Sequence, residues 1–241
     1  MIEIKQFGKD ISFADVLKIK SMTGVCEKHG ETEFFSIFGR KPCCSKCNDE
    51  QDLEEKRKIE EARRRKFISL CHIPVELEGC TFDNYKASTH GQQELLAQVQ
   101  SIADDFAGRI VVFLGSYGLG KSHLAVACLK KVGGLYLKAS EMTRGYNALY
   151  PSDKEKVFNE WCAKRLLVID EIGTGSVKDE LPLLQDVIAT RYDKHSPMIL
   201  ISNMNLNVFL DYVGGLIKSR LASLRGEYIL FEGQDYRQLV S

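Results

Sequence analysis

The sequence predicts an α/β fold, a parallel sheet with helices between its strands, preceded by a small N-terminal domain and a linker helix. Three observations predict it. From residue 80 on, short apolar runs of strand type alternate with helical patterns. A glycine-rich segment follows one of these runs. Before residue 50, two closely spaced pairs of Cys and His residues precede a charged stretch. We expect two domains, 1–70 and 71–241, because Pro74 and Gly79 punctuate the chain near that boundary.

The composition is that of an ordinary globular protein, with 44% apolar and 27% charged residues in a chain of 241. Lys and Arg number 33 and so do Asp and Glu, so net charge argues neither for nor against nucleic-acid binding. The sequence has no apolar run long enough for a membrane span, and Met1 to Lys5 lack the pattern of a secretory signal. We therefore expect a cytoplasmic protein that does not bind membranes.

Eight cysteines in a reducing compartment favour metal binding over disulfides. Cys26-x-x-His29 and Cys44-x-x-Cys47 are two chelating pairs with the spacing of a structural zinc site, and four such ligands leave no open position for chemistry. Cys43 is an alternative to Cys44, although the x₂ spacing of Cys44 and Cys47 fits a zinc knuckle better. We expect the other four cysteines to be buried small residues.

Two helices are expected beside this zinc module. Residues 5–22 have weak helical periodicity, which fits either a partner-binding helix or a solvated one. Residues 49–66 mix acids and bases at helical spacing, with acids first and bases last, as suits a solvated linker helix. The run 63–66 is basic and could contact nucleic-acid phosphates, but a solvated helix face is the favoured interpretation.

The elements after residue 80 follow in order. Residues 92–106 form an amphipathic helix, and 109–114 is a β-branched and aromatic strand. Ser140 caps a helix that follows a strand at 134–137. The later predicted strands are 165–171, 198–203 and 228–231, and the later predicted helices are 153–162, 180–193, 206–212 and 214–224. Helices between strands indicate a parallel sheet with its site at the carboxyl ends of the strands.

The glycine-rich segment satisfies the full G-x-x-x-x-G-K-[ST] pattern between a predicted strand and a predicted helix. Its residues are Gly115, Ser116, Tyr117, Gly118, Leu119, Gly120, Lys121 and Ser122. Backbone N–H groups of such a loop surround phosphates, the lysine contacts the β- and γ-phosphates, and the hydroxyl of Ser122 is offered to Mg²⁺. We therefore expect ATP and Mg²⁺ to bind here.

Polar residues end the two strands that follow. Asp170 ends an apolar strand, where a carboxylate can hold the Mg²⁺ that Ser122 contacts, and Glu171 can polarise an attacking water. Asn203 ends the next apolar strand and can donate to the γ-phosphate or to the water. The pair of acids indicates a hydrolysing ATPase, because a kinase needs no second acid for water. Arg220 and Arg237 are late arginines suited to neutralising γ-phosphate charge, but electrostatics alone does not choose them over Arg191 or Arg225.

A resemblance to a known family favours Arg220 and Arg237. The sequence resembles the DnaC-type loaders of replicative helicases, which are AAA+ P-loop ATPases related to bacterial initiators, over about residues 80–238. The motifs that carry it are Phe82-x-Asn84-Tyr85 after Cys80, the phosphate loop, Leu167 to Gly173, Ser202-Asn203, Ser219-Arg220-Leu221 and Tyr236-Arg237. The N-terminal zinc module is similar to that of several phage and bacterial loaders.

The resemblance implies that Lys121, Ser122, Asp170, Glu171 and Asn203 bind and hydrolyse ATP. Arg220 would be the arginine finger that acts in trans, and Arg237 would be the second sensor. It also implies a DnaB-type helicase bound by the N-terminal region, self-association through the AAA+ interface, and a ring that grips single-stranded DNA. Leu216 departs from the family, many members of which have an additional arginine there. Lys178, Arg191 and Lys194 are candidate DNA contacts by charge and location alone.

Two alternatives remain open from the sequence. An IstB-type transposition helper shares nearly all of the ATPase pattern and differs in its partner; the zinc module and the Cys80 context argue against it. A small-molecule P-loop kinase with an appended zinc module is the other. The Asp170–Glu171 pair and the absence of a recognisable acceptor lid argue against the kinase.

Overall fold

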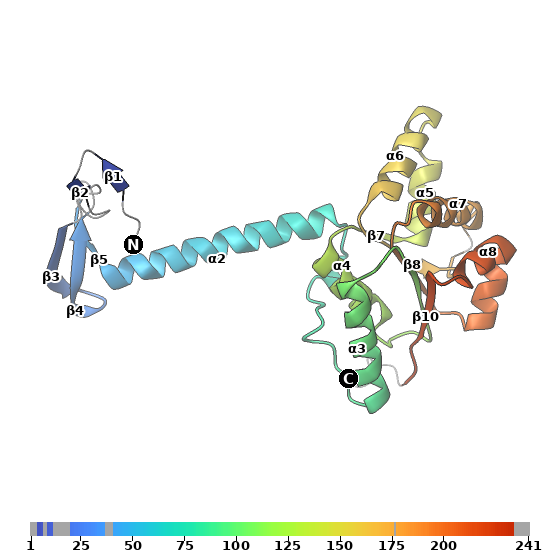
Figure 1. Ribbon diagram of the computed structural model, residues 1–241, viewed down its shortest axis with the longest axis horizontal. Helices are drawn as coiled ribbons and strands as arrows, with labels where there is room; N and C mark the ends of the chain where they lie inside the picture. The colour runs from blue at the N-terminus through green and yellow to red at the C-terminus, as the bar shows by residue number, and fades with distance from the viewer. Residues whose placement is uncertain (1–3, 7–8, 12–19, 37–40, 176, 234–241) are drawn as a thin grey trace. The chain divides into compact units, whose positions relative to one another are not determined.

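The computed structural model describes residues 4–6, 9–11, 20–36, 41–175 and 177–233 (Figure 1). The chain divides into two compact units, Met1–Lys66 and Phe67–Ser241.

The described residues of the N-terminal unit form two small antiparallel sheets. Strands β1 (Ile4–Gln6) and β2 (Lys9–Ile11) pair with each other. Strands β3 (Lys20–Cys26), β4 (Gly30–Ser36) and β5 (Cys43–Cys44) form the second sheet in that order. The expected helix over 5–22 is therefore wrong in its described parts, which are strands. A glycine such as Gly8 is unfavourable inside a helix and commonly interrupts a regular element, which explains why the helix prediction is wrong. Residues 12–19 lie outside the described residues.

Helix α2 (Ser45–Leu70) confirms the predicted linker helix and extends it at both ends. Most of its side chains are solvated, and Ile68, near its end, is its buried residue. Ion pairs between neighbouring turns, such as Arg65 with Glu61 at 2.6 Å, connect exposed side chains. The composition of α2 thus matches its environment, because charged residues at helical spacing stabilise a helix that has little apolar surface to bury.

The second unit is built on a parallel sheet of five strands, which confirms the predicted fold class. The strands are β6 (Ile110–Leu114), β7 (Leu135–Lys138), β8 (Leu167–Ile172), β9 (Met198–Ser202) and β10 (Gly226–Leu230). Their order is β10-β6-β9-β8-β7. Strand β9 therefore lies between β6 and β8, so the segments that follow these three strands meet at one edge of the sheet.

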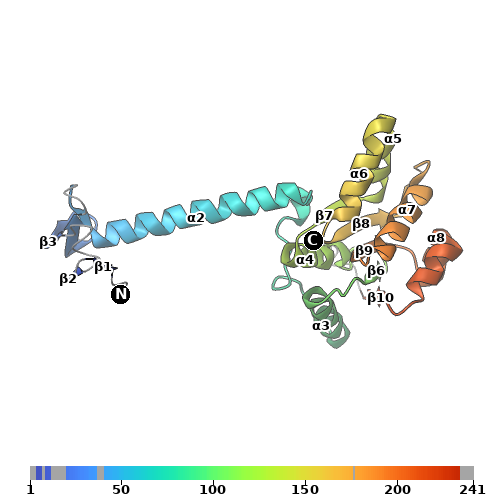
Figure 2. The ribbon, with the colours of Figure 1, turned by 45° about the horizontal axis from the view of Figure 1, so that its top comes forward.

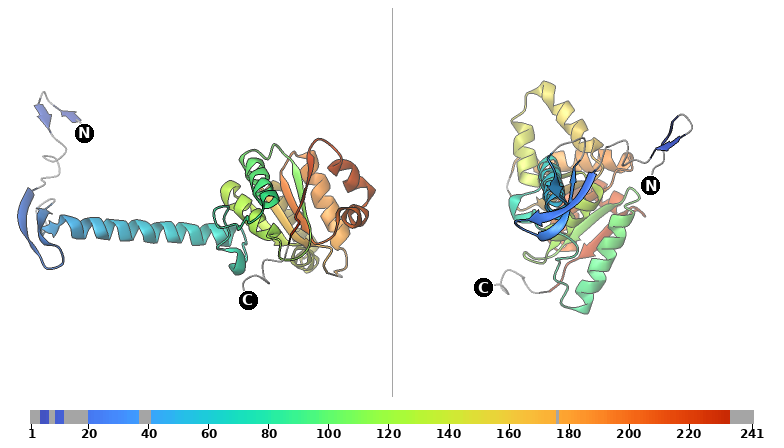
Figure 3. Two further views of the ribbon diagram at one scale, coloured as in Figure 1. Left: turned by 90° about the horizontal axis from the view of Figure 1, so that it is seen from below. Right: turned by 90° about the vertical axis from the view of Figure 1, so that its left-hand side faces the viewer.

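Helices cover both faces of this sheet (Figures 2 and 3). Helices α3 (His90–Asp104) and α4 (Lys121–Val132) pack on one face against Val111 and Phe113. Ile110 and Val112 point to the other face. The helices there are α5 (Ala139–Asn147), α6 (Pro151–Ala163), α7 (Glu180–Asp193) and α8 (Leu206–Leu221). Because successive residues of a strand point to opposite faces, one apolar run fills both cores.

Local sequence signals fix the start of α3 and the interruption of α8. Thr89 and Gln92 form a reciprocal capping box at the start of α3. Gly214 has φ +80° and interrupts α8, in agreement with the two helices predicted over that range. No helix among the described residues is both long enough and apolar enough to cross a bilayer.

Candidate functional site

The glycine-rich loop connects β6 to α4, and two of its glycines are required by close contacts. Gly115 has φ +138°, and a Cβ there would lie 2.3 Å from the carbonyl oxygen of Phe231. Gly120 has φ +83°, and a Cβ there would lie 2.5 Å from the ring of Tyr85. Any side chain at either position would displace the backbone or the Tyr85 ring. The loop conformation thus depends on both glycines.

Lys121, the first residue of α4, is 5% exposed and turns back into the loop. Its Nζ donates to the carbonyl oxygens of Gly115 and Ser116, each at 2.6 Å. The ammonium group therefore contacts two carbonyl oxygens of the phosphate loop. This position, at the N-terminus of a helix, is suited to an anion.

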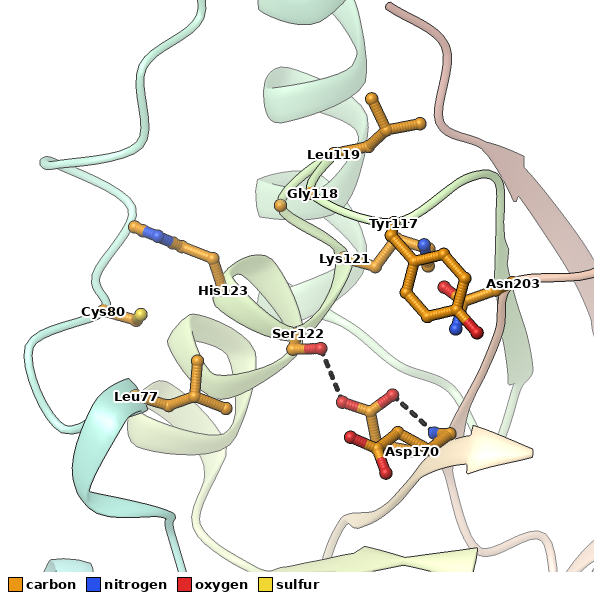
Figure 4. A pocket seen from close by; sticks show the side chains of 12 residues that line it. Leu77, Cys80, Tyr117, Gly118, Leu119, Lys121, Ser122, His123, Asp170 and Asn203 are labelled. Carbon is orange, nitrogen blue, oxygen red and sulfur yellow. Dashed lines mark hydrogen bonds between the residues drawn. The ribbon is translucent and has the colours of Figure 1, made fainter. Parts of the chain in front are cut away.

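Asp170 and Ser122 are in direct contact at the end of β8 (Figure 4). Ser122 Oγ donates to Asp170 Oδ2 at 2.5 Å, and Oδ1 accepts from the backbone N–H of Glu171 at 2.6 Å. Asp170 is 4% exposed. A hydroxyl and a carboxylate so close together are the ligands that Mg²⁺ prefers beside a bound phosphate, so these residues fit the predicted metal site.

Glu171 sits on an irregularity of β8. The pairing of β8 with β9 shifts between Ile169 and Ile172, and Glu171 has φ +59°, which is unusual for a residue with a side chain. Thr174 Oγ1 donates to the Glu171 carbonyl at 2.7 Å and helps to hold the turn. The Glu171 side chain, close to half exposed, pairs with Lys138 Nζ at 3.2 Å, and this contact raises the pKa of Lys138. Such a bulge re-aims a side chain beside a functional site.

A single cavity collects most of the predicted nucleotide residues, although Gly115 and Ser116 are not among those that line it (Figure 4). It is lined by residues 117–123 of the loop and α4, by Asp170 and Glu171 from β8, and by Asn203, which follows β9. Leu77 and Cys80 line the same cavity. The order of the strands therefore places the loop, the two acids and the amide around one space.

The segment from Glu78 to Tyr85 is fixed against the phosphate loop and α4. Lys130 Nζ donates to the carbonyls of Glu78 and Cys80, at 2.6 and 2.7 Å. His123 Nε2 lies 2.8 Å from the Thr81 carbonyl oxygen, and the hydroxyl of Tyr85 donates to the Leu119 carbonyl at 3.3 Å. The sequence pointed to this segment only through the family resemblance; the physical signal is a turn in which Thr81 and Asn84 bond to each other.

Tyr136 is a site residue that sequence reasoning missed. It lies on β7, and its hydroxyl donates to Asp170 Oδ2 at 2.5 Å. Burial and the charge of Asp170 raise the pKa of this hydroxyl far above its ordinary value. A lone tyrosine in an apolar strand is normally a core residue, so no pattern in the sequence distinguishes it.

Arg220 is not brought to the cavity of its own chain. Its guanidinium lies 5.5 Å from the centre of the Tyr192 ring and 3.6 Å from Asp193 Oδ1, at the end of α7. Arg225 stacks on the same ring at 3.9 Å. Arg237 lies outside the described residues, so its proposed role as a sensor remains a prediction.

Arg191 is not a DNA contact, although its charge made it a candidate. It is 0% exposed and donates to four carbonyls, those of Trp161, Cys162, Lys164 and Pro197. Burial lowers its pKa to about 10, so it stays protonated at neutral pH. Arg191 joins the end of α6 to the segment before β9. Lys178 and Lys194 are exposed, and their role stays a prediction.

The Cys/His cluster forms in the N-terminal unit. Cys26 ends β3, His29 precedes β4, Cys44 lies in β5 and Cys47 lies in the first turn of α2, and their ligand atoms are all within 4.8 Å of one another. The sulfurs of Cys26 and Cys47 are 3.6 Å apart. Tetrahedral zinc with Zn–S bonds of about 2.3 Å requires sulfurs about 3.8 Å apart, so the set fits zinc. Cys43 is not in the cluster, since its thiol is directed to the Cys44 carbonyl.

Glu50 orients the histidine of this cluster. His29 Nδ1 faces the thiols, at 3.4 Å from Cys47 and 3.7 Å from Cys26 and Cys44, while Nε2 lies 3.2 Å from Glu50 Oε1. Backbone hydrogen bonds from Lys28 and His29 lower the pKa of Cys26 to about 6. A carboxylate on the outer nitrogen and thiolates on the inner one are typical of a histidine that binds zinc.

Comparison with known proteins decides the family. Residues 48–216, well over half of the chain, match the model of the IstB-like ATP binding proteins. The chain belongs to this family. The IstB-like chain is also 28% identical over 194 residues to the uncharacterized protein YdaV of Escherichia coli K12, an alignment covering 76% of the chain and 78% of YdaV.

The replicative helicase loader DnaC of the same strain is 25% identical over 175 residues, which are 68% of the IstB-like chain and 71% of DnaC. A crystal structure of the DnaC helicase loader superposes with a TM-score of 0.56 at 20% identity, covering 66% of the chain and all of that structure. This likeness confirms the AAA+ fold. The IstB-like chain is thus an AAA+ protein of the ATPase class, and the alternative of a small-molecule kinase is disfavoured.

Proposed function

We propose that this chain is an ATP-dependent loader that binds a DnaB-type replicative helicase and places it on single-stranded DNA. One observation carries the proposal: the phosphate loop, the Asp170–Glu171 pair and Asn203 line one cavity in a chain whose sequence is similar to a replicative helicase loader. Loading needs a conformational cycle, and ATP binding followed by hydrolysis at such a cavity supplies one.

In this proposal each residue at the cavity has one role. Lys121 places its charge on the β- and γ-phosphates when ATP displaces the loop carbonyls that it now contacts. Ser122 and Asp170 would hold Mg²⁺, which when bound neutralises phosphate charge. Glu171 accepts a hydrogen bond from the attacking water and polarises it, and Asn203 orients the γ-phosphate or that water. Release of Glu171 from Lys138 would free the carboxylate for this task.

Arg220 would complete the site of a neighbouring copy of the chain. It contacts Tyr192 and Asp193, and it is not among the described residues that line the cavity of its own chain. A guanidinium supplied by a neighbour would neutralise the charge of the γ-phosphoryl group in the transition state. Arg237 would act in cis as the second sensor. Hydrolysis would then depend on assembly through the AAA+ interface.

The N-terminal region, residues 1–70, would bind the helicase, and zinc would hold its fold. Cys26, His29, Cys44 and Cys47 leave no open coordination position, so a zinc ion there serves structure. A module this small draws much of its folding free energy from the metal.

The partner is tested by capture and then by loading. The tagged protein should retain the replicative helicase of its host, identified by mass, and the Cys26→Ser variant should lose it. With both proteins pure, ATP and the loader should increase the helicase bound to circular single-stranded DNA. Failure of both measurements, with a folded and ATP-binding loader, would contradict the proposal.

The family description supports a second candidate, an IstB-type helper of transposition. It uses the same ATPase chemistry and differs in its partner. Capture of a transposase in place of the helicase, in the same experiment, would favour it.

The zinc assignment predicts about one Zn²⁺ per chain, since the cluster provides one set of four ligands. Cys44→Ser should lose the metal and Cys43→Ser should keep it, because the Cys43 thiol is directed away from the cluster. Metal analysis of the purified proteins measures both. The reverse pattern would show that the ligand assignment is wrong, and a metal-free wild type would show that the module is misinterpreted.

Glu50→Gln should weaken zinc binding by about tenfold, the lower end of the range for residues that orient metal ligands, because Glu50 is partly exposed. Zinc release to a chromophoric chelator measures the change. Glu54→Gln, one turn further along α2, is the matched control, since Glu54 contacts Arg57 and Lys58 instead of the histidine. Equal release from the two variants would remove Glu50 from the site.

A further inference from the structure

Two hydroxyls converge on one oxygen of the Asp170 carboxylate. Ser122 Oγ, at the start of α4, and Tyr136 Oη, on β7, each donate to Oδ2 at 2.5 Å. Oδ1 accepts from the N–H of Glu171 at 2.6 Å. Both oxygens of a carboxylate that is 4% exposed are therefore held by donors from three different segments.

Tyr136 is held rigidly enough to direct its hydroxyl. It is 3% exposed, and its ring packs in the apolar cluster that includes Leu124 and Cys128 of α4. Its backbone is fixed on both sides, by parallel pairing with Val168 of β8 and by an N–H that donates to the Cys71 carbonyl at 2.8 Å. The phenol therefore has little freedom to follow a carboxylate that moves.

We propose that Tyr136 is a positioning residue that holds the Asp170 carboxylate in the orientation needed to bind Mg²⁺ with ATP. The proposal rests on the Mg²⁺ site of the proposed function. Without the phenol hydroxyl, Oδ2 keeps only the donor from Ser122, and Ser122 is itself the other expected ligand. Once Ser122 turns to the metal, the N–H of Glu171 on Oδ1 would be the remaining one of these three donors, so the carboxylate would be held less firmly about its χ2 bond and binding of the metal would have to fix its orientation. Donors that orient metal ligands commonly change metal affinity by about 10–100-fold.

The experiment measures nucleotide affinity with and without the metal. A fluorescent ATP analogue is titrated into the full chain in Mg²⁺ and again in EDTA, and the ratio of the two dissociation constants gives the contribution of Mg²⁺. Tyr136→Phe should reduce this ratio by about tenfold and leave the constant in EDTA nearly unchanged. Tyr146→Phe, which removes a hydroxyl from a ring packed on Trp161, is the control and should behave as the wild type.

A double-mutant cycle distinguishes positioning from a general loss of packing. If Tyr136 acts through the carboxylate, Tyr136→Phe should have almost no further effect on the Mg²⁺ ratio in an Asp170→Asn background. An unchanged ratio in Tyr136→Phe, or equal losses in both backgrounds, would overturn the proposal while leaving the ATP site in place. If Mg²⁺ does not change the nucleotide affinity of the wild type, the assignment of the metal site is wrong, and so is the role of Tyr136.

Discussion

Replacing Glu171 with Gln is expected to lower ATP turnover by about 10²–10⁴-fold while ATP stays bound. The substitution keeps the size of the side chain and its ability to contact the cavity, but removes the charge that polarises water. The bulge in β8 and the contacts of the neighbouring backbone do not involve the Glu171 carboxylate, so the loop should keep its shape. Steady-state phosphate release and equilibrium nucleotide binding measure the two effects separately.

Lys121→Ala serves as the comparison, because it should weaken ATP binding, which Glu171→Gln leaves intact. It removes the ammonium group that faces the phosphates, so nucleotide affinity itself should fall. Glu160→Gln, an exposed site on α6 that pairs with Lys164, is the matched control for the Glu to Gln change and should retain full turnover. Equal turnover by the wild type and Glu171→Gln would remove Glu171 from the mechanism.

Arg220→Ala is expected to lower assembled turnover by about 10³–10⁵-fold, the range of arginine fingers in other NTPases. ATP affinity should stay nearly intact, because Arg220 does not line the cavity of its own chain. Wild-type turnover per subunit should rise with protein concentration, or with added helicase and single-stranded DNA, and the variant should lose that rise. Arg144→Ala, an exposed arginine on α5, is the control. A variant that turns over ATP like the wild type would show that Arg220 is structural.

The sheet could be predicted because two of its inner strands, β6 and β9, are buried at every position. Residues 110–114 and 198–201 are all apolar, and the buried Ser202 ends the second run; this composition fits strands covered on both sides. The order of the strands does not follow from composition, since each crossover depends on long-range packing. Weak helical periodicity in 5–22 is a poor guide to the short strands there. Strands β3 and β5 carry cysteines of the Cys/His cluster, and antiparallel pairing beside a metal site depends on the ligands more than on periodicity.

The residues of the candidate site could be predicted where a polar side chain lies at or just after the end of a strand. Ser122, Asp170 and Asn203 stand at positions that a parallel sheet brings together, and the structure brings them to one cavity. The contact of Tyr136 with Asp170 joins residues 34 positions apart on neighbouring strands, and no local sequence pattern predicts it. For Arg191 the sequence predicted a functional role that the structure does not support. Its charge suggested a surface, but four carbonyl acceptors stabilise it inside the domain.

The proposed ATPase site is completed by a neighbouring copy of the chain, and mixing two inactive variants tests this most directly. Lys121→Ala subunits cannot use ATP but still carry Arg220, and Arg220→Ala subunits have a complete cavity but no finger. Mixed under conditions of assembly, with helicase and single-stranded DNA, the two should recover ATP turnover that neither shows alone. No recovery, together with wild-type turnover per subunit that is independent of concentration, would contradict a shared site.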